Sequence, residues 1–171
     1  TPGPGSRGFG ESEPLDRTVA DAEQRWHAPL AEQGRQLAVM IAPELAATRV
    51  EGRMTSNVLD VLLENAWVHG RGRVLIAVRS AAGAVALDVA DEGSLSANLL
   101  DPFLRGVSTG GGAGLGLSIA QTMAAVAGGR LVLSRRSPTR FTLFFAASPT
   151  ERGVLTGDPA TAHPASLGPS T

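Results

Sequence analysis

A run of glycines leads directly into a helical pattern in the stretch GGGAGLGLSIA, residues 110–120. Glycine inside a helix or strand costs up to about 1 kcal/mol relative to alanine, so such a run indicates a loop that bends sharply or lets a ligand come close. From Leu115 onward the apolar residues recur at helical spacing, so a helix begins where the glycines end. Because backbone N–H groups at a helix N-terminus attract anions, phosphate is the obvious ligand to expect here.

Polar side chains elsewhere in the chain could contribute to the same site. Asn65 lies inside a predicted helix, where asparagine is a mediocre former, and His69 follows one turn later. Asp91 ends an apolar strand pattern beside Gly93, where its carboxylate could accept a hydrogen bond from a ligand amine. The forked donors of Arg105 fit phosphate. Each residue also has an ordinary structural interpretation, as a helix-boundary residue, a turn residue or a solvated charge.

Composition excludes several classes of protein. The formal net charge of −1 argues against nucleic-acid binding, which calls for a strongly basic surface. All 15 basic residues are arginine, and a P-loop requires its lysine, so that nucleotide-binding motif is absent. There is no cysteine, which excludes disulfides and thiolate metal sites, and no apolar stretch approaches the ~20 residues of a membrane span.

The elements that must position these side chains follow from apolar periodicity. Helices are expected over 15–32, 54–69 and 115–127, and strands over 35–43, 48–52, two within 73–93 and two within 130–146. Segments 1–13 and 149–171, rich in Pro, Gly, Ser and Thr, are expected to be a disordered linker and a disordered tail around one domain over 14–148. The order of elements predicts an α+β fold, a two-layer sandwich with about three helices on one face of a mixed sheet.

The second helix carries the strongest pattern. Ser56 or Asn57 could cap its N-terminus, and Gly70 stops it. Its core-facing stripe at i, i+3, i+4 and i+7 consists of Leu59, Leu62, Leu63 and Ala66.

Four segments occur in an order that resembles one family closely. They read VLDVLLENAWVHG over 58–70, DVADEG over 88–93, LLDPFLRG over 99–106 and GGAGLGLSIA over 111–120. These are similar to the N, G1, F and G2 boxes of the ATP-binding domain of sensor histidine kinases. That domain belongs to the wider GHKL class, with the Bergerat fold, shared with gyrase, Hsp90 and MutL. The resemblance covers about residues 20–147 and implies the same fold and ATP as the ligand.

The resemblance also implies a role for each matching residue. Asn65 matches the asparagine that coordinates Mg²⁺, a hard cation that prefers oxygen ligands. His69 lies in the same box and is expected to contact the nucleotide. Asp91 matches the aspartate that accepts from the adenine amino group, with Gly93 beside it.

The F box and the G2 box complete the implied site. Phe103 and Arg105 match residues that steady the lid and approach the terminal phosphate, so Asn65 and Arg105 are the expected catalytic residues. The nucleotide-binding residues expected in and after the glycine loop are Gly112, Gly114, Leu115, Gly116 and Leu117.

The chain departs from the family pattern at some positions. Val61 stands where the family usually has Asn or an acid, Val68 where Lys or Arg is common, and Leu95 near the place of a second G1 glycine. These departures keep open a non-catalytic interaction module of the same fold, and a serine kinase of the anti-sigma type also stays open. A dinucleotide-binding oxidoreductase is rejected, because its glycines would follow the first strand with an acid about 20 residues later.

The resemblance implies the catalytic part of a bacterial two-component sensor kinase. It would pass the γ-phosphoryl group of ATP to a histidine on a separate dimerisation domain of the same parent protein, and from there to a cognate response regulator. His27 occupies the family's first helix and is not expected to be the acceptor. The fragment is expected in the cytoplasm, with any membrane anchor in parent segments outside it.

Overall fold

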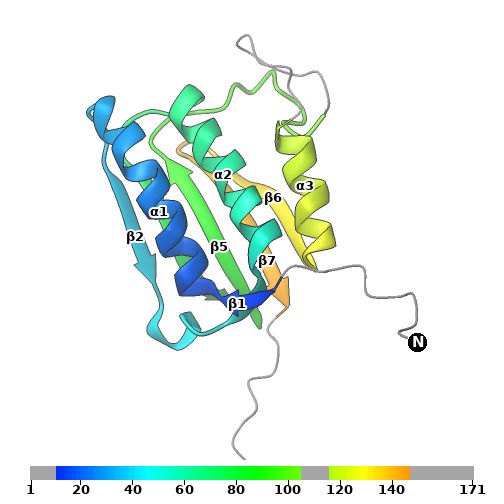
Figure 1. The fold of residues 1–171 in the computed structure, drawn as a ribbon. Coiled ribbons are helices and arrows are strands. Elements are labelled where there is room, and N and C mark those ends of the chain that lie inside the picture. The colour runs from blue at the N-terminus through cyan, green and yellow to red at the C-terminus, as the bar shows by residue number, and fades with distance from the viewer. Residues whose placement is uncertain (1–10, 105–115, 147–171) are drawn as a thin grey trace, which may run out of the picture.

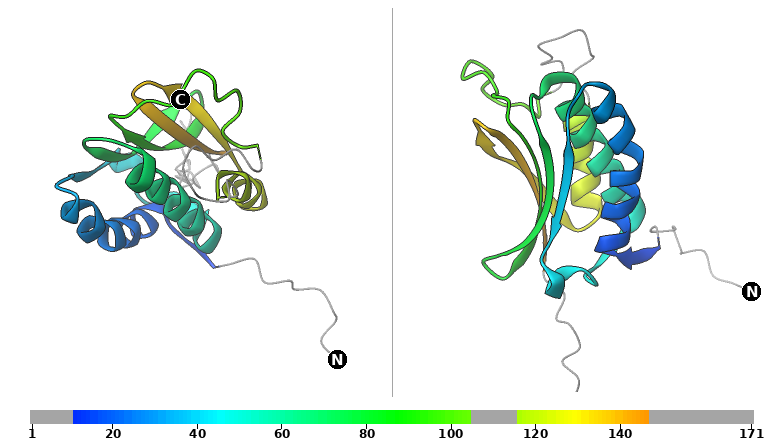
Figure 2. Two further views of the ribbon diagram at one scale, coloured as in Figure 1. Left: turned by 90° about the horizontal axis from the view of Figure 1, so that it is seen from above. Right: turned by 90° about the vertical axis from the view of Figure 1, so that its left-hand side faces the viewer.

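The computed structural model describes residues 11–104 and 116–146, which form two layers. Three helices lie side by side on one face of a five-stranded sheet (Figure 1), and the other face of the sheet carries no helix (Figure 2). The helices are α1 (Leu15–Glu32), α2 (Gly52–His69) and α3 (Gly116–Val126). The strands are β1 (Ser12–Pro14), β2 (Leu37–Ile41), β3 (Arg49–Glu51), β4 (Val74–Ala81), β5 (Ala84–Asp91), β6 (Gly129–Arg136) and β7 (Thr139–Ala146), with a short 3₁₀ helix at Pro43–Leu45. The predicted α+β sandwich is confirmed.

The five strands run in the order β2-β4-β5-β7-β6. Only β2 and β4 are parallel, and the other neighbouring pairs are antiparallel, so the sheet is mixed as predicted. β4 and β5 form a tight hairpin through Ala82 and Gly83, both with positive φ. β6 and β7 form the second predicted hairpin, which turns at Ser137 and Pro138. β5 therefore lies in the middle of the sheet and carries Asp91 at its end.

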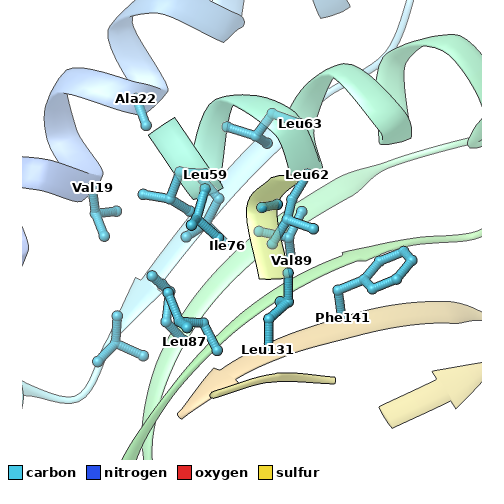
Figure 3. Packing of buried hydrophobic residues seen from close by; sticks show 14 of the residues in the cluster. Val19, Ala22, Leu59, Leu62, Leu63, Ile76, Leu87, Val89, Leu131 and Phe141 are labelled. Carbon is cyan, nitrogen blue, oxygen red and sulfur yellow. The ribbon is translucent and has the colours of Figure 1, made fainter. Parts of the chain in front are cut away.

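The core fills the space between the helices and the sheet. Leu59 and Leu62 of α2 point toward the sheet residues Leu87 and Val89, and Leu63 lies in the same cluster, as Figure 3 shows. All five side chains are at most 3% exposed, and the predicted stripe on α2 is confirmed, including its fourth member at position 66. Complete burial of a leucine stabilises a fold by about 1.5–3 kcal/mol, so this stripe fixes the position of α2 on the sheet.

The N-terminus of α2 differs from the predicted cap. The helix begins at Gly52, and the side chain of Glu51 accepts a hydrogen bond from Met54 N–H at 2.5 Å. The prediction of Ser56 or Asn57 as the cap was wrong, because the helix starts several residues earlier, directly after β3. Glu51 is a residue of that strand, and its side chain provides the acceptor that a shorter polar residue usually supplies.

A small second sheet lies at the N-terminal end of the domain. Residues 12–14 pair antiparallel with residues 49–51, so an ordered strand occupies the end of the segment that the sequence assigned to a linker. Proline and acidic residues concealed this strand, since its pairing partner lies 37 positions away. Among the described residues, no helix is long and apolar enough to cross a bilayer.

Candidate functional site

The site is organised around Asp91, at the end of the central strand β5. The side chain is 6% exposed. Its Oδ1 accepts hydrogen bonds from the backbone N–H groups of Gly93, at 2.6 Å, and Arg71, at 3.2 Å. No described residue donates to Oδ2. A carboxylate oxygen without a donor among the described residues is an acceptor that a ligand amine can use.

Two glycines pack directly against this carboxylate. A Cβ added at Gly70 would lie 2.7 Å from Asp91 Cγ, and one added at Gly93 would lie 2.6 Å from Asp91 Oδ1. Real Cβ atoms do not approach other atoms so closely. Gly70 and Gly93 therefore leave the space in which the carboxylate sits, and any larger residue at either position would displace it.

The segment after α2 is bound to the end of β5 by backbone hydrogen bonds. Glu92 N–H donates to Arg71 O at 2.9 Å, and Arg73 N–H donates to the Glu92 carboxylate at 3.1 Å. Gly72 has φ +59°, and a Cβ there would overlap the Glu92 carboxylate, so the turn needs glycine. These contacts fix the C-terminal end of α2 relative to Asp91.

Arg35 supports the same junction from the start of β2. Its guanidinium donates to Ala66 O at 2.8 Å and to Gly72 O at 2.7 Å. Ala66 O also accepts from Gly70 N–H at 2.9 Å, so Arg35 is a second donor to this carbonyl near the end of the helix. Arg35 is thus a positioning residue for α2 and for the turn after it.

Asn65 and His69 lie one turn apart on α2, next to this junction. Asn65 is half-buried, and its side chain forms no hydrogen bond with any described residue. His69 is exposed at the last position of the helix, followed immediately by Gly70, which contacts Asp91. The structure therefore brings the C-terminal end of the Asn65 helix next to the Asp91 strand, and the ligand roles of Asn65, His69 and Asp91 stay predictions.

The start of α3 meets α2 one turn before Asn65. A Cβ added at Gly116 would lie 3.5 Å from Val61 Cγ1, so the first residue of α3 contacts α2 there. Val61 and Gly70 are nine positions apart on the chain, about 14 Å along a helix. Asn65 lies between them, so the start of α3 and the Asp91 carboxylate lie near α2 on either side of Asn65. Leu117, the next residue of α3, is half-buried against the core.

The segment after β5 is held against the far edge of the sheet. Phe103 packs edge-on against Phe141 of β7, with ring centroids 5.9 Å apart. Arg136 of β6 donates to Leu99 O at 2.8 Å and to Leu100 O at 3.1 Å. Phe103 therefore anchors its loop to the core, which is the ordinary structural interpretation of that residue.

Part of the expected site lies outside the described residues. Arg105, Gly112, Gly114 and Leu115 all fall within residues 105–115, and their roles stay predictions. The sequence analysis missed three features of the site among the described residues. These are Gly70, Arg35 and the backbone N–H of Arg71. Gly70 was read from the sequence only as a helix stop, because nothing in the sequence reveals which side chain a stop residue touches.

Comparisons with known proteins agree with this arrangement. A sequence profile described as histidine kinase-, DNA gyrase B-, and HSP90-like ATPase matches residues 50–149, and the chain belongs to this family. Sensor protein DivL of Caulobacter vibrioides is 34% identical over 107 residues, which cover 58% of this chain. The match spans 14% of the length of DivL, so this chain corresponds to a small part of that protein.

Solved structures share the fold at low sequence identity. The catalytic domain of the histidine kinase ThkA has a TM-score of 0.69 at 19% identity, covering 81% of this chain and 96% of that one. The histidine kinase AdeS of Acinetobacter baumannii gives 0.67 at 18% identity, covering 81% and 67%. Full-length ShkA, solved in complex with AMPPNP, gives 0.69 at 22% identity, covering 81% and 32%.

Proposed function

We propose that this chain is the ATP-binding catalytic part of a bacterial sensor histidine kinase. The observation that carries the proposal is the geometry of Asp91: one oxygen is held by two backbone donors, and the other is left for a ligand. That arrangement fits an exocyclic amine, as in adenine, and does not fit a carbonyl at the same position, as in guanine. The likeness to ShkA, a protein solved with an ATP analogue, supports a nucleotide ligand.

The residues of α2 and α3 would hold the polyphosphate end of ATP. The free side chain of Asn65 provides an amide oxygen of the kind that Mg²⁺ accepts, together with phosphate oxygens and water. The described residues contain no cluster of three or more His, Cys, Asp and Glu side chains that could hold a metal by themselves. Asn65 fits this requirement, because Mg²⁺ in phosphate sites needs only one or two protein ligands. The N-terminus of α3 would attract phosphate through the positive end of its helix dipole.

When bound, ATP supplies the γ-phosphoryl group: its bond to the β-phosphate oxygen breaks, a bond to an imidazole nitrogen forms, and ADP leaves. This chain would contribute positioning and charge neutralisation, through Asn65 with Mg²⁺, the α3 N-terminus and Arg105. The accepting histidine would lie on a dimerisation domain of the same parent protein, and a response regulator would receive the group afterwards. The chain would act in the cytoplasm, with any membrane anchor elsewhere in the parent.

One observation favours a second candidate, a non-catalytic interaction module of the same fold. Val61 packs against the apolar core and the start of α3, at a position where the family usually has Asn or an acid. A valine there cannot contribute an oxygen ligand.

The experiment that tests the proposal measures binding first and transfer second. Titration calorimetry with ATP and with GTP, each with Mg²⁺, is expected to give binding of ATP alone. Adding the dimerisation domain of the parent protein and labelled ATP is then expected to yield acid-labile phosphohistidine on that domain. Binding without transfer would favour the serine kinase or a degenerate enzyme, and the appearance of phosphoserine on a partner would identify the former. Absence of any nucleotide binding would leave the interaction module.

A further inference from the structure

Strand β6 lies at an edge of the sheet, on the side of α3 (Figure 1). It pairs with β7, and no other described strand pairs with its outer side. An edge strand exposes a row of backbone N–H and C=O groups, and another extended chain can pair with them. The free edge is therefore able to accept a further strand.

A groove of about 460 Å³ lies along this edge. Its wall on one side is formed by loop residues 100–103, which include the acidic residue Asp101, and Gln121 of α3 also contributes. Its floor is residues 131–136 of β6. Leu100 is 87% exposed, while its carbonyl is held by Arg136, so the wall presents an apolar side chain on a fixed backbone.

The opposite side of the same strand is basic. Arg135 stands directly opposite Arg140 of β7, and Arg130 stands opposite Phe144. Arg140 and Phe144 are four residues apart on one strand, so they and their partners share the face of the sheet that carries no helix. Like charges directly opposite one another destabilise a sheet, which makes the Arg135–Arg140 pair costly without an anion nearby.

No ion pair joins these arginines to a carboxylate within the described part of the chain, although Asp101 lines the groove together with Arg135. Residues 116–146 contain four arginines and no Asp or Glu. The two ion pairs found among the described residues use Arg25 and Arg79 instead. Arg130, Arg135 and Arg140 therefore stand without an acidic partner there.

We propose that the free edge of β6 binds an extended segment of another protein, in which acidic side chains alternate with apolar ones. Side chains of a strand point alternately to the two faces, so the apolar set would enter the groove beside Leu100 while the acidic set meets Arg130 and Arg135. Backbone pairing supplies affinity, and the alternating side chains supply selectivity. The inference concerns the β6 edge of the sheet and does not require a bound nucleotide, although the groove wall includes Phe103, which the sequence also implicates in the lid.

A purely protective role for the same features is the alternative that the experiment must separate. A register shift between Leu133 and Arg135 interrupts the pairing of β6 with β7. Bulges and charged side chains are devices by which proteins prevent edge strands from pairing with other chains. Protection of this kind predicts that no extended peptide pairs with β6, whatever its charge.

The test uses the full 171-residue chain and two fluorescein-labelled peptides. Each has about nine residues, the length of a long strand, and alternates a charged residue with Val or Thr. The charged residue is Glu in the first peptide and Lys in the second. Fluorescence anisotropy measures the dissociation constant at low and high salt, and amide hydrogen exchange with mass spectrometry locates the protected segment.

We expect the Glu peptide to bind and the Lys peptide not to bind. Salt should weaken the binding, and bound peptide should slow amide hydrogen exchange over residues 129–136. Arg135→Glu should raise the dissociation constant about fivefold or more, as expected when one exposed ion pair becomes a repulsion. Leu100→Ser should also weaken binding, through the groove. Arg17→Glu, an equal charge reversal at an exposed position of α1, serves as the matched control and should leave binding unchanged.

Circular dichroism melting of each variant checks that the fold is retained. Absence of binding by the Glu peptide would overturn the proposal in favour of edge protection. Three other results would also overturn the proposal: the Lys peptide binds as tightly as the Glu peptide, Arg17→Glu weakens binding as much as Arg135→Glu, or hydrogen exchange over β6 does not change. Each would mean that the peptide does not bind at the β6 edge through its acidic side chains.

Discussion

The Asp91 carboxylate accepts a hydrogen bond of 3.2 Å from the backbone N–H of Arg71, which joins the end of β5 to the turn after α2. The same oxygen accepts from Gly93 N–H. One side chain thus holds together the two elements that form the candidate site. Its second oxygen, Oδ2, remains for the ligand. Oδ1 therefore stabilises the fold, and Oδ2 is available to recognise the ligand.

This division of roles predicts that two substitutions of Asp91 will behave differently. Asp91→Asn keeps a carbonyl oxygen for the two backbone donors and replaces the free acceptor with an amide donor. We expect the free energy of unfolding to change by less than about 1 kcal/mol, while ATP binding is lost. Asp91→Ala leaves two N–H groups without an acceptor. It should therefore lose ATP binding and also lower the free energy of unfolding by about 2–3 kcal/mol.

Urea denaturation and calorimetry measure the two effects separately. A variant Asp91→Asn that still binds ATP with unchanged affinity would remove Asp91 from the role of base-reading residue. Equal stability of the two variants would contradict the structural half of the argument.

A second prediction concerns two glycines, one beside Asp91 and one at the start of α3. A methyl group at Gly70 would come 2.4 Å from Ala66 O and 2.7 Å from Asp91 Cγ. Gly70→Ala should therefore destabilise the fold by about 1–3 kcal/mol and weaken nucleotide binding by displacing the carboxylate.

Gly116→Ala is the matched control for that substitution. Its methyl group would meet Val61 at 3.5 Å, an ordinary contact, and alanine is the better helix former. The melting temperature of Gly116→Ala should equal or exceed that of the parent chain. A larger loss of stability for Gly116→Ala than for Gly70→Ala, measured by thermal unfolding, would show that the contacts at Gly70 do not limit the fold.

The three long helices and the five strands of the main sheet could be predicted because each has a local signal. The stripe of α2 repeats with the helical period, and the turn at Ala82 and Gly83 separates two alternating apolar runs. Asn65 and Asp91 could be proposed together only through the order of four motifs, since residues 26 positions apart carry no local sign of contact. The order of the motifs predicted that Asn65 and Asp91 belong to one site, and the structure shows how α2 and β5 are positioned relative to each other.

The features that could not be predicted depend on contacts between distant segments. The Glu51 cap depends on where α2 leaves β3, and β1 depends on a partner 37 residues away. Gly70 is required by a carboxylate that follows 21 positions later. Helix and strand propensities of short windows contain no information about such neighbours.

A third prediction concerns a polar chain on the face of the sheet without helices. Asp88 is 3% exposed, accepts from Arg79 Nε at 2.6 Å, and accepts from Thr142 Oγ1 at 2.6 Å. Arg79→Ala leaves a buried carboxylate without its cation and should cost about 3 kcal/mol. Asp88→Ala leaves a guanidinium side chain that is 43% exposed and can be hydrated, so its cost should be smaller.

Chemical denaturation of the two variants checks that order, and ATP binding should be unchanged in both, because neither residue contacts the candidate site. If Asp88→Ala were the more destabilising change, burial of the unpaired carboxylate would not be the dominant cost.

The same pair predicts how stability responds to alkaline pH. The hydrogen bond that Arg79 donates to the Asp88 carboxylate raises the pKa of Arg79 above its ordinary value. A group whose pKa is higher in the folded state stabilises the fold fully below its unfolded pKa and loses that contribution only as the pH rises through the folded value. The stability difference between the parent chain and Arg79→Met should therefore be constant from about pH 7 to about pH 10. A difference that declines within this interval would indicate that another group titrates with the pair.

A final prediction concerns Asn65, which is half-buried on α2 and forms no hydrogen bond with any described residue. Asparagine costs a helix up to about 0.7 kcal/mol relative to alanine, so Asn65→Ala should leave the fold equally stable or slightly more stable. If Asn65 contributes an oxygen ligand to Mg²⁺, the same variant should lose the Mg²⁺-dependent part of ATP affinity, measured by titrations with Mg²⁺ and with a chelator. Gln121→Ala, an exposed amide on α3, provides the control and should change neither quantity. Replacing a residue whose role is to bind a ligand is expected to raise stability while function is lost. An unchanged Mg²⁺ dependence of ATP binding in Asn65→Ala would instead assign the metal to other oxygen atoms.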